Sequence, residues 1–585
     1  MTSSNLYCQF LMSIAEKHRV RRAICSPGSR NAPLLIAAEG CDSIETRIVV
    51  DERAAAFIAL GEALVSRRPV MLICTSGTAL LNYAPAVAEA YYAGIPLIVV
   101  SADRPMEWID QDDSQTMRQF EALEHFVKKS YNLPVYCDDL GKRGDNLRWY
   151  VERSVNDAML TAMQPKKGPV HINIQLDVPL GVTVNGAGAQ GRYIESVSGP
   201  TDLSVRQKLE LAKTACESKV LILCGFNAPD HNLRRAIKDL STKFDNVVIM
   251  AETLSNLGDG GELRYCMVDS LLTTLNEDEL EAIRPDLVIT TGGALVSRQV
   301  KDWLRKYKPK MHWSVGYNHT TVDCLQSLTS RIEADPARFL RQLSISMLTI
   351  TERKQHCEIS GNSYRDTVNA LRARGAIYRD TFVESSPWSD MKAFSIIKRH
   401  FPQDANLYLS NGTAVRYDQL FGIHAHATFC NRGVSGIDGC TSSAVGAALA
   451  YTSSIPEWSD EKGETILITG DMSFSYDLGA LGSGLIPDTM KIIVLNNSGG
   501  GIFRYIGSTS ALPGYLLERC FCADPKLNIK AVTEAFGLKW FGAETATQLE
   551  NILPEFFNSR EASLLEIKTD GKVSAEVLKR YMEGK

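Results

Sequence analysis

The stretch TILITGDMSFSYDLGALGSGLIPDTMKIIVLNNSGGGIF, residues 465–503, contains two aliphatic strand patterns with a helix pattern between them. Gly470-Asp471 ends the first strand, and Asn497 with a glycine-rich loop ends the second. Open α/β sheets bind ligands at the carboxyl ends of their strands, so we expect the acid and the amide to lie close together. Oxygen ligands of this kind suit Mg²⁺, which completes its shell with phosphate oxygens. The stretch therefore predicts a magnesium–diphosphate site in an α/β protein.

The same residues allow a plainer interpretation. Gly-Asp is a common pair, and an aspartate at this place can cap a helix ahead of an ordinary glycine turn. The spacing, the strand–helix–strand context and the Asn-Ser-Gly-Gly loop favour the metal site. We expect its ligands to be Asp471, Asn497 and the backbone carbonyl of Gly499.

The composition is that of an ordinary globular protein. The chain has 585 residues, enough for about three domains, with 44% hydrophobic and 22% charged residues. A net charge of −5 gives no indication of nucleic-acid binding.

The longest apolar runs, such as residues 95–100, are strand-length, so no integral membrane segment is expected. The N-terminal 20 residues lack the features of a secretory signal and are expected to form an amphipathic helix. The 14 scattered cysteines favour reduced thiols in a cytoplasmic protein.

Three blocks follow one another along the chain, at residues 1–185, 200–350 and 380–585. Each alternates continuous apolar strands with helix patterns, which predicts an α/β fold of three doubly wound, mostly parallel sheets. The glycine-rich stretch from Gly181 reads as a linker, and residues 340–375 are expected to be helical. Strands are expected at residues 23–25, 46–50, 70–74, 96–101, 170–175, 220–224, 247–251, 287–291, 311–315, 406–410, 427–430, 465–469, 491–496 and 563–568.

Two segments of the first block carry further candidates. Glu52 opens a helix directly after a strand, where it is either a first-turn acid that complements the helix dipole or a partly buried carboxylate with a raised pKa that exchanges a proton with a ring nitrogen. Residues 26–30 (SPGSR) form either a turn with a capping serine or an anion site in which Arg30 and helix N–H groups face a carboxylate. Residues 75–78 (TSGT) have the same position in the next unit.

Arginines at predicted strand ends form another set. Arg298, Arg416 and Arg432 lie in loops, where an arginine is usually a solvated surface group. Several on one face would suit a substrate with more than one carboxylate. The histidines show no metal-ligand spacing, and neither G-x-S-x-G nor a Walker A motif occurs.

Several motifs together resemble one enzyme family. These are SPGSRNAPL from Ser26, DERAAAFIALGEAL from Asp51, DDSQTMRQ from Asp112, NRGVSGIDG from Asn431 and the two halves of the opening stretch. In this order they are similar to the thiamine-diphosphate-dependent enzymes, most closely to the branch that acts in menaquinone biosynthesis. The resemblance runs from about residue 20 to residue 510. It implies that residues 1–185 bind the pyrimidine of the cofactor, that residues 200–350 form a central domain and that residues 380–585 bind the diphosphate and the metal.

The resemblance also implies roles for individual residues. Glu52 would activate thiamine diphosphate through a ring nitrogen, and Gln115 would orient the bound intermediate. The implied metal ligands for Mg²⁺, or alternatively Mn²⁺, are Asp471, Asn497 and Gly499. The implied cofactor-binding residues are Glu52, Ser76, Gly77, Ile437, Gly470, Asp471, Met472, Ser473, Asn497 and Ile502. The implied substrate-binding residues are Ser29, Arg30, Gln115, Arg298, Arg416, Arg432, Ile502 and Phe503.

The implied activity is that of a transferase. It would decarboxylate 2-oxoglutarate and add the succinyl acyl-anion equivalent to isochorismate in a 1,4 sense. The family forms its sites between subunits, so a homodimer or homotetramer is expected. The alternatives are another thiamine-diphosphate 2-oxoacid decarboxylase or carboligase, and a non-catalytic ligand sensor on the same scaffold. Three positions depart from the family pattern: Met472 replaces a glycine, Ser297 stands where a lysine often precedes the arginine, and Gly412 stands where a serine is often found.

Overall fold

The computed structural model describes residues 1–136, 141–197, 199, 202–257, 265–318, 320–353, 363–453 and 463–584. The chain forms two compact units, each made of segments distant in sequence. The first unit comprises Met1–Ser198, Asn431–Lys462 and Tyr476–Met490. The second comprises Gly199–Cys430, Gly463–Ser475 and Lys491–Lys585. Among the described residues, no helix is long and apolar enough to cross a bilayer.

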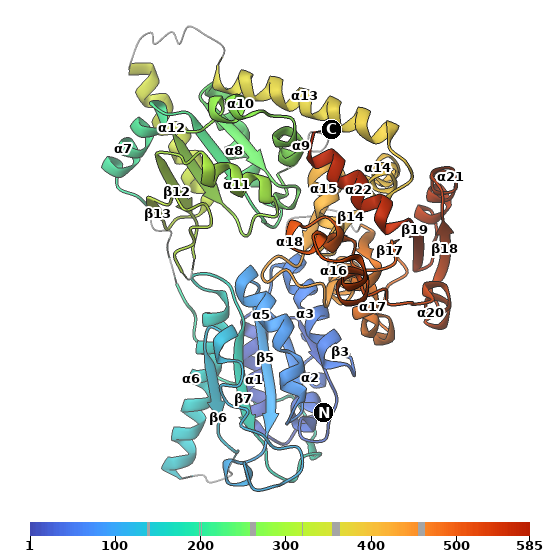
Figure 1. Ribbon diagram of the computed structural model, residues 1–585. Helices are drawn as coiled ribbons and strands as arrows, with labels where there is room; N and C mark the ends of the chain where they lie inside the picture. The colour runs from blue at the N-terminus through green and yellow to red at the C-terminus, as the bar shows by residue number, and fades with distance from the viewer. Residues whose placement is uncertain are drawn as a thin grey trace. The chain divides into compact units, whose positions relative to one another are not determined.

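Three larger sheets confirm the predicted α/β fold class (Figure 1). The N-terminal sheet has the strand order β3-β2-β4-β5-β7-β6 and parallel pairs throughout. Its strands are β2 (Arg22–Cys25), β3 (Glu45–Ile48), β4 (Val70–Cys74), β5 (Leu97–Asp103), β6 (Ser130–Leu133) and β7 (Val170–Gln175). Its helices are α1 (Leu6–Lys17), α2 (Ala32–Glu39), α3 (Glu52–Ser66), α4 (Ala79–Asn82), α5 (Ala84–Ala93) and α6 (Lys142–Met163).

The central sheet is also parallel, in the order β10-β9-β11-β12-β13. Its strands are β9 (Val220–Cys224), β10 (Val247–Ala251), β11 (Leu287–Thr291), β12 (Met311–Val315) and β13 (Ser330–Ile332). Its helices are α7 (Val205–Cys216), α8 (His231–Lys243), α9 (Val268–Thr273), α10 (Glu277–Ala282), α11 (Arg298–Lys306) and α12 (Pro336–Arg353). The long helix α13 (Tyr364–Ser385) follows, and α12 and α13 confirm the helical region expected around residues 340–375.

The C-terminal sheet has the order β15-β14-β16-β17-β19-β18. Its strands are β14 (Asn406–Leu409), β15 (Ala427–Cys430), β16 (Thr465–Gly470), β17 (Met490–Asn496), β18 (Lys539–Ala543) and β19 (Ser563–Lys568). Its main helices are α14 (Asp390–His400), α15 (Ala414–Phe421), α16 (Cys440–Ser453), α17 (Asp471–Tyr476), α20 (Ile529–Ala535), α21 (Ala546–Phe557) and α22 (Gly571–Met582). Each of the three predicted blocks contains one sheet, while the block boundaries stay a prediction.

The strands that the sequence did not reveal are edge strands. β6, β13 and β18 each lie at the outer end of a sheet. Each mixes polar or charged residues with apolar ones, because an edge strand is covered less completely than a central one. The central strand β4, in contrast, is buried at every position and reads as one continuous apolar run.

The glycine-rich stretch expected to be a linker is instead packed on the first unit. Within it, the short strand β8 (Thr183–Val184) pairs antiparallel with β1 (Thr2–Ser3). Further on, the Gly191 N–H donates to Ser13 Oγ at 2.9 Å, and Lys17 Nζ donates to the Gly191 carbonyl at 3.0 Å. The segment thus contacts one side of α1, and α6 and α2 pack against the same helix, so that α1 is buried from Tyr7 to Ala15.

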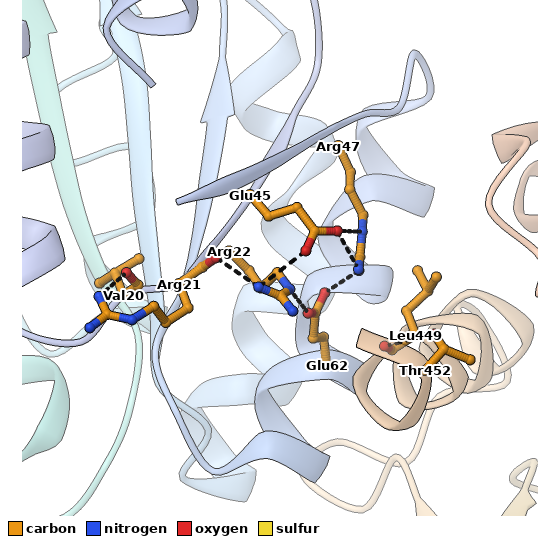
Figure 2. Close-up of polar contacts among 8 residues, drawn as sticks. All are labelled: Val20, Arg21, Arg22, Glu45, Arg47, Glu62, Leu449 and Thr452. Atoms are coloured by element: carbon orange, nitrogen blue, oxygen red, sulfur yellow. Dashed lines mark hydrogen bonds and ion pairs between the residues drawn. The ribbon is translucent and has the colours of Figure 1, made fainter. Parts of the chain in front are cut away.

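A buried ion cluster holds α3 against two strands (Figure 2). Glu62 of α3 is 2% exposed and pairs with Arg22 of β2 at 3.0 Å and with Arg47 of β3 at 2.9 Å. Glu45 bridges both arginines, at 3.2 Å and 2.8 Å. Burial raises the pKa of Glu62, and the arginines oppose that effect. Since α3 begins at Glu52, the cluster fixes the helix that carries this candidate catalytic acid.

Helices α3 and α16 cross in backbone contact within the first unit. A Cβ atom on Gly61 would lie 1.9 Å from the Ser443 carbonyl oxygen, and one on Gly446 would lie 1.9 Å from the Ile58 carbonyl oxygen. Only a glycine leaves room for the facing backbone at each of these positions. The Ala- and Gly-rich sequence of α16 therefore suits close packing against α3.

Replacing Gly61 by alanine is expected to lower the melting temperature. Overpacking typically costs about 1–3 kcal/mol, which exceeds the roughly 1 kcal/mol that alanine gains over glycine in a helix. Differential scanning calorimetry of Gly61→Ala measures the change. Gly181→Ala is the matched control, because a Cβ atom there meets nothing within 4 Å. Equal melting temperatures for both variants and the wild type would contradict the close crossing.

Candidate active site

The acid and the amide of the opening stretch meet at the carboxyl ends of β16 and β17, as predicted. Asp471 is 4% exposed; its Oδ1 accepts from the Met472 N–H at 2.9 Å and its Oδ2 from the Gly499 N–H at 2.7 Å. Burial, with smaller contributions from Asp390 and Asp524, raises the pKa of Asp471 to about 7. A bound cation would offset the burial of this carboxylate, so the site is suited to one.

The orientation of Asn497 also suits a cation. Its Nδ2 donates to Asp390 Oδ2 at 2.6 Å, whereas its Oδ1 is buried without a hydrogen-bond partner. The carbonyl of Gly499 accepts from the Gly501 N–H at 2.9 Å and keeps a second lone pair. Carboxylate, amide and carbonyl oxygens are the donors that Mg²⁺ prefers. The residues present therefore fit the metal implied by the sequence.

The glycines after Asn497 allow the loop to fold tightly. Gly499 has a φ of +123°, and a Cβ atom there would lie 2.3 Å from the Cys522 carbonyl oxygen. The Gly500 N–H donates to that same carbonyl at 2.7 Å. Ile502 and Phe503 follow in a short 3₁₀ helix (Gly501–Arg504) and are half-buried. The loop thus places two apolar side chains directly after the predicted metal ligands.

Arg416 lies near this loop, whereas Arg298 faces solvent. Arg416 of α15 is half-buried, and its charge lowers the pKa of Tyr505, which burial raises. Tyr505 belongs to the same loop, because its N–H donates to the Ile502 carbonyl at 3.3 Å. Arg298 is the first residue of α11. Its side chain is 82% exposed and pairs with Asp302 at 3.3 Å.

In the first unit, Glu52 lies at the start of α3 and is half-buried. The preceding Asp51 caps the helix by accepting from the Arg53 and Ala54 N–H groups at 3.0 Å and 3.2 Å. Glu52 lies close to the end of β4, since its charge adds to the effect of burial in raising the pKa of the Cys74 thiol. This arrangement brings Glu52 towards residues 75–78, the second candidate anion loop.

That loop contains buried hydroxyls and one glycine with a positive φ. The Oγ of Ser76 is buried without a hydrogen-bond partner. Gly77 has a φ of +87°, and its N–H donates to Gln119 Oε1 at 2.9 Å. Gln119 in turn donates to the Ala102 carbonyl at 2.8 Å. Gln119 was not a sequence candidate, although it lies in the DDSQTMRQ motif.

The remaining first-unit candidates differ in exposure. Ser29 and Gln115 are exposed, and Gln115 has a φ of +55°. Arg30 is buried, and its Nη1 donates to the Leu176 carbonyl at 2.9 Å. Burial lowers the pKa of Arg30, and the nearby Arg104 lowers it further. Arg104, which was not a sequence candidate, therefore lies near Arg30, and it pairs with Asp113 at 2.7 Å.

A buried glutamate holds the loop of Arg432 and Ile437. Glu89 of α5 is 3% exposed and accepts from the Val434 N–H at 2.6 Å, the Ser435 N–H at 3.2 Å and the Gly433 N–H. Burial raises its pKa, while these donors and Arg432 oppose that effect. A lone acid in an otherwise apolar helix, AVAEAYYA, was the signal that could have revealed it.

Comparison with known proteins agrees with these two groups of residues. Residues 7–122 match the thiamine pyrophosphate enzyme N-terminal TPP binding domain, and residues 412–567 match the C-terminal TPP binding domain. The 2-succinyl-5-enolpyruvyl-6-hydroxy-3-cyclohexene-1-carboxylate synthase of Porphyromonas gingivalis is 39% identical over 98% of this chain and 96% of its own length. The chain belongs to this synthase family.

Further members show the same near-complete coverage. The synthase of Flavobacterium psychrophilum is 35% identical over 98% of both chains. That of Desulfotalea psychrophila is 34% identical over 94% of this chain and 96% of its own. The family is one of thiamine-diphosphate-dependent enzymes, and the chain has both of the domains that bind this cofactor. The sequence similarity to the synthases thus extends over both groups of candidate residues and over the central sheet, which lies between them in the sequence.

Replacing Asp471 by asparagine is expected to weaken binding of thiamine diphosphate with Mg²⁺ by at least about tenfold, because a neutral amide replaces the only carboxylate among the predicted ligands. Isothermal titration calorimetry measures the affinity, and circular dichroism confirms that the fold is kept. Asp239→Asn, at a half-exposed carboxylate on α8, is the control. Wild-type affinity in Asp471→Asn would remove Asp471 from the metal site.

Replacing Glu89 by alanine is expected to loosen the loop at residues 433–435. Three partly buried N–H groups would lose their acceptor, at a cost of up to about 1–3 kcal/mol for each one left unsatisfied. Hydrogen exchange followed by mass spectrometry should show faster exchange in peptides that cover the loop. Unchanged exchange there, with faster exchange elsewhere, would show that Glu89 does not anchor this loop.

Proposed function

We propose that this chain decarboxylates 2-oxoglutarate and joins the remaining succinyl unit to isochorismate in a 1,4-addition, a step of menaquinone biosynthesis. The observation that carries the proposal is the Asp471–Asn497–Gly499 set, with the buried Asn497 Oδ1 left without a protein partner. It is supported by the sequence identity of 39% and 35%, over 98% of this chain, to two synthases that are named for the corresponding product.

The second unit would hold the diphosphate through a metal ion. Asp471, Asn497 and the Gly499 carbonyl are the proposed ligands of Mg²⁺, with Mn²⁺ as an alternative. Asp390 would keep the Asn497 amide turned so that its oxygen faces the cation. Thiamine diphosphate, when bound, supplies the electron sink that decarboxylation of a 2-oxoacid requires. The protein's part is to bind and orient the cofactor and the substrates, and to neutralise their charge.

Glu52 is the proposed proton-transfer residue. Its carboxylate would hold a proton at the pyrimidine ring nitrogen of the cofactor, a role suited to an acid at the boundary between apolar and polar surroundings. Val49 and Ala54 beside it are buried, whereas Val50 is 76% exposed. The exposed Val50, with Ile48 at 48%, supports the proposal that a second subunit covers this region in a homodimer or homotetramer.

Arginines would bind the two acidic substrates. Guanidinium groups pair with carboxylates through two parallel hydrogen bonds, so Arg30, Arg416 and Arg432 are the proposed anchors, with Arg298 at the more exposed position. Gln115 would orient the reacting group. The cytoplasm is the proposed compartment, because the cysteines are scattered along the chain and most of the described ones are buried.

The activity is tested by product analysis. The protein is mixed with thiamine diphosphate, Mg²⁺, 2-oxoglutarate and isochorismate, and the products are followed by mass spectrometry. The expected product has the combined mass of both substrates minus CO₂. Loss of CO₂ without this adduct would leave the thiamine-dependent decarboxylase as the function, and no change in either substrate would exclude the proposed donor.

Replacing Glu52 by glutamine should reduce turnover by about 100-fold or more, because a general acid–base residue contributes roughly 10²–10⁴-fold. The binding of thiamine diphosphate is expected to stay within a few-fold of wild type, because the variant keeps the size of the side chain. Steady-state kinetics and calorimetry measure the two quantities. Near-normal turnover would refute the role of Glu52.

A further inference from the structure

One buried acid connects two elements that carry candidate substrate arginines. Asp269 on α9 is 8% exposed, and its Oδ1 accepts a hydrogen bond from Ser297 Oγ. Ser297 is the N-cap of α11, since its Oγ also accepts from the Val300 N–H at 3.0 Å. Arg298 is the next residue. Asp269 is therefore tied directly to the start of the helix that presents Arg298.

The neighbouring residue ties α9 to the helix that carries Arg416. Ser270 Oγ donates to the Leu420 carbonyl of α15 at 2.9 Å, and the Tyr581 hydroxyl donates to Ser270 Oγ at 3.1 Å. Helix α9 packs against both α11 and α15. Two adjacent residues of one short helix thus hold two other helices, each with an arginine at or near its start.

The start of α11 is held a second time from another direction. Glu252, which follows β10, is 2% exposed and accepts from the Val296 and Ser297 N–H groups at 2.8 Å and 2.7 Å. Because Glu252 already fixes this backbone, the contact of Ser297 with Asp269 is not needed merely to place the turn. The contact between Ser297 and Asp269 therefore acts mainly on the charge and orientation of the groups that face Asp269.

Two cationic side chains and three hydroxyls lie near Asp269. Burial raises the pKa of Asp269 to about 6, while Ser297, Arg416 and Lys301 oppose that effect. Tyr505 and Tyr581 also lie close, because Asp269 contributes to raising the pKa of each hydroxyl. Above pH 6 the carboxylate is mainly ionised and attracts the guanidinium of Arg416; below pH 6 it is mainly neutral and that attraction is lost.

We propose that Asp269 is a positioning residue that holds Arg416 and the start of α11 in one arrangement, so that Arg416 and Arg298 bind the carboxylates of one acidic substrate. The inference rests on the proposed function in taking these arginines as substrate-binding. The carboxylate does not touch the reacting atoms. It acts through Arg416, whose half-buried guanidinium already donates from Nη1 to the Gly412 carbonyl and also lies in the field of the Asp269 carboxylate.

The experiment compares the wild type with Asp269→Asn, which keeps the shape and removes the charge. Binding of isochorismate and of 2-oxoglutarate, each alone, to protein loaded with thiamine diphosphate and Mg²⁺ is measured by calorimetry at pH 5.5 and 7.5, and KM and kcat are measured with both. The substrate carboxylates stay ionised over this range, since their ordinary pKa values are about 4. Ser297→Ala keeps the carboxylate, and Asp239→Asn is the control for a charge removed elsewhere.

The wild type is expected to bind one of the two acids more weakly at pH 5.5 than at pH 7.5. Asp269→Asn should bind that acid about tenfold more weakly at pH 7.5, with no such pH dependence and a nearly unchanged kcat. Ser297→Ala should keep the pH dependence, and Asp239→Asn should match the wild type.

The results with isochorismate alone are independent of turnover, because this acid does not react without the donor; with 2-oxoglutarate alone the measured heat also includes any decarboxylation. If the expected binding pattern is found but no product forms, the positioning role of Asp269 is supported and the proposed function is excluded. Wild-type affinity and pH dependence in Asp269→Asn would overturn the inference, whether or not its melting temperature falls. Binding of neither acid to the wild type would overturn it too.

Discussion

The geometry of the first unit depends on the crossing of α3 and α16, where two glycines leave no side chain between the helix backbones. Helix α3 begins at Glu52, and α16 directly follows the loop that carries Arg432 and Ile437. A third contact strengthens the crossing, because a Cβ atom on Gly439 would overlap the Phe57 ring. The crossing therefore brings a segment from beyond residue 430 against α3 and fixes it relative to the candidate catalytic acid.

Within each of the two units, buried carboxylates that accept backbone N–H groups hold loops that carry candidate residues. Glu89 holds the loop of Arg432, Asp471 holds Gly499, and Glu252 holds the turn before Arg298. Asp477 acts in the same way on α16, accepting from the Ser442 N–H at 2.6 Å. Such charge-assisted bonds are stronger than neutral ones, but burial disfavours the ionised form. That conflict is why burial raises the pKa of Asp477 to about 6 and that of Asp471 to about 7.

Much of the fold was predictable because the central strands are buried on both faces. Runs such as residues 70–74 and 220–224 are apolar throughout, and the observed β4 and β9 coincide with them. The edge strands β6, β13 and β18 escaped prediction because partial exposure permits polar residues. The glycine-rich stretch after Gly181 was taken for a linker because its contacts with α1 join positions some 175 residues apart, as in the pair Gly191–Ser13, and no local pattern records such a contact.

The sequence by itself determined that Asp471 and Asn497, the predicted metal donors, lie together, because each follows a parallel strand and such strand ends meet at one sheet edge. Only the tertiary structure decided how those donors are oriented and which arginines are buried. Asp390 turns the Asn497 amide from 107 positions away, and the Asp269–Ser297 bond spans 28 positions. Helix and strand periodicity carries information over a few turns, whereas these partners are set by how separate elements pack.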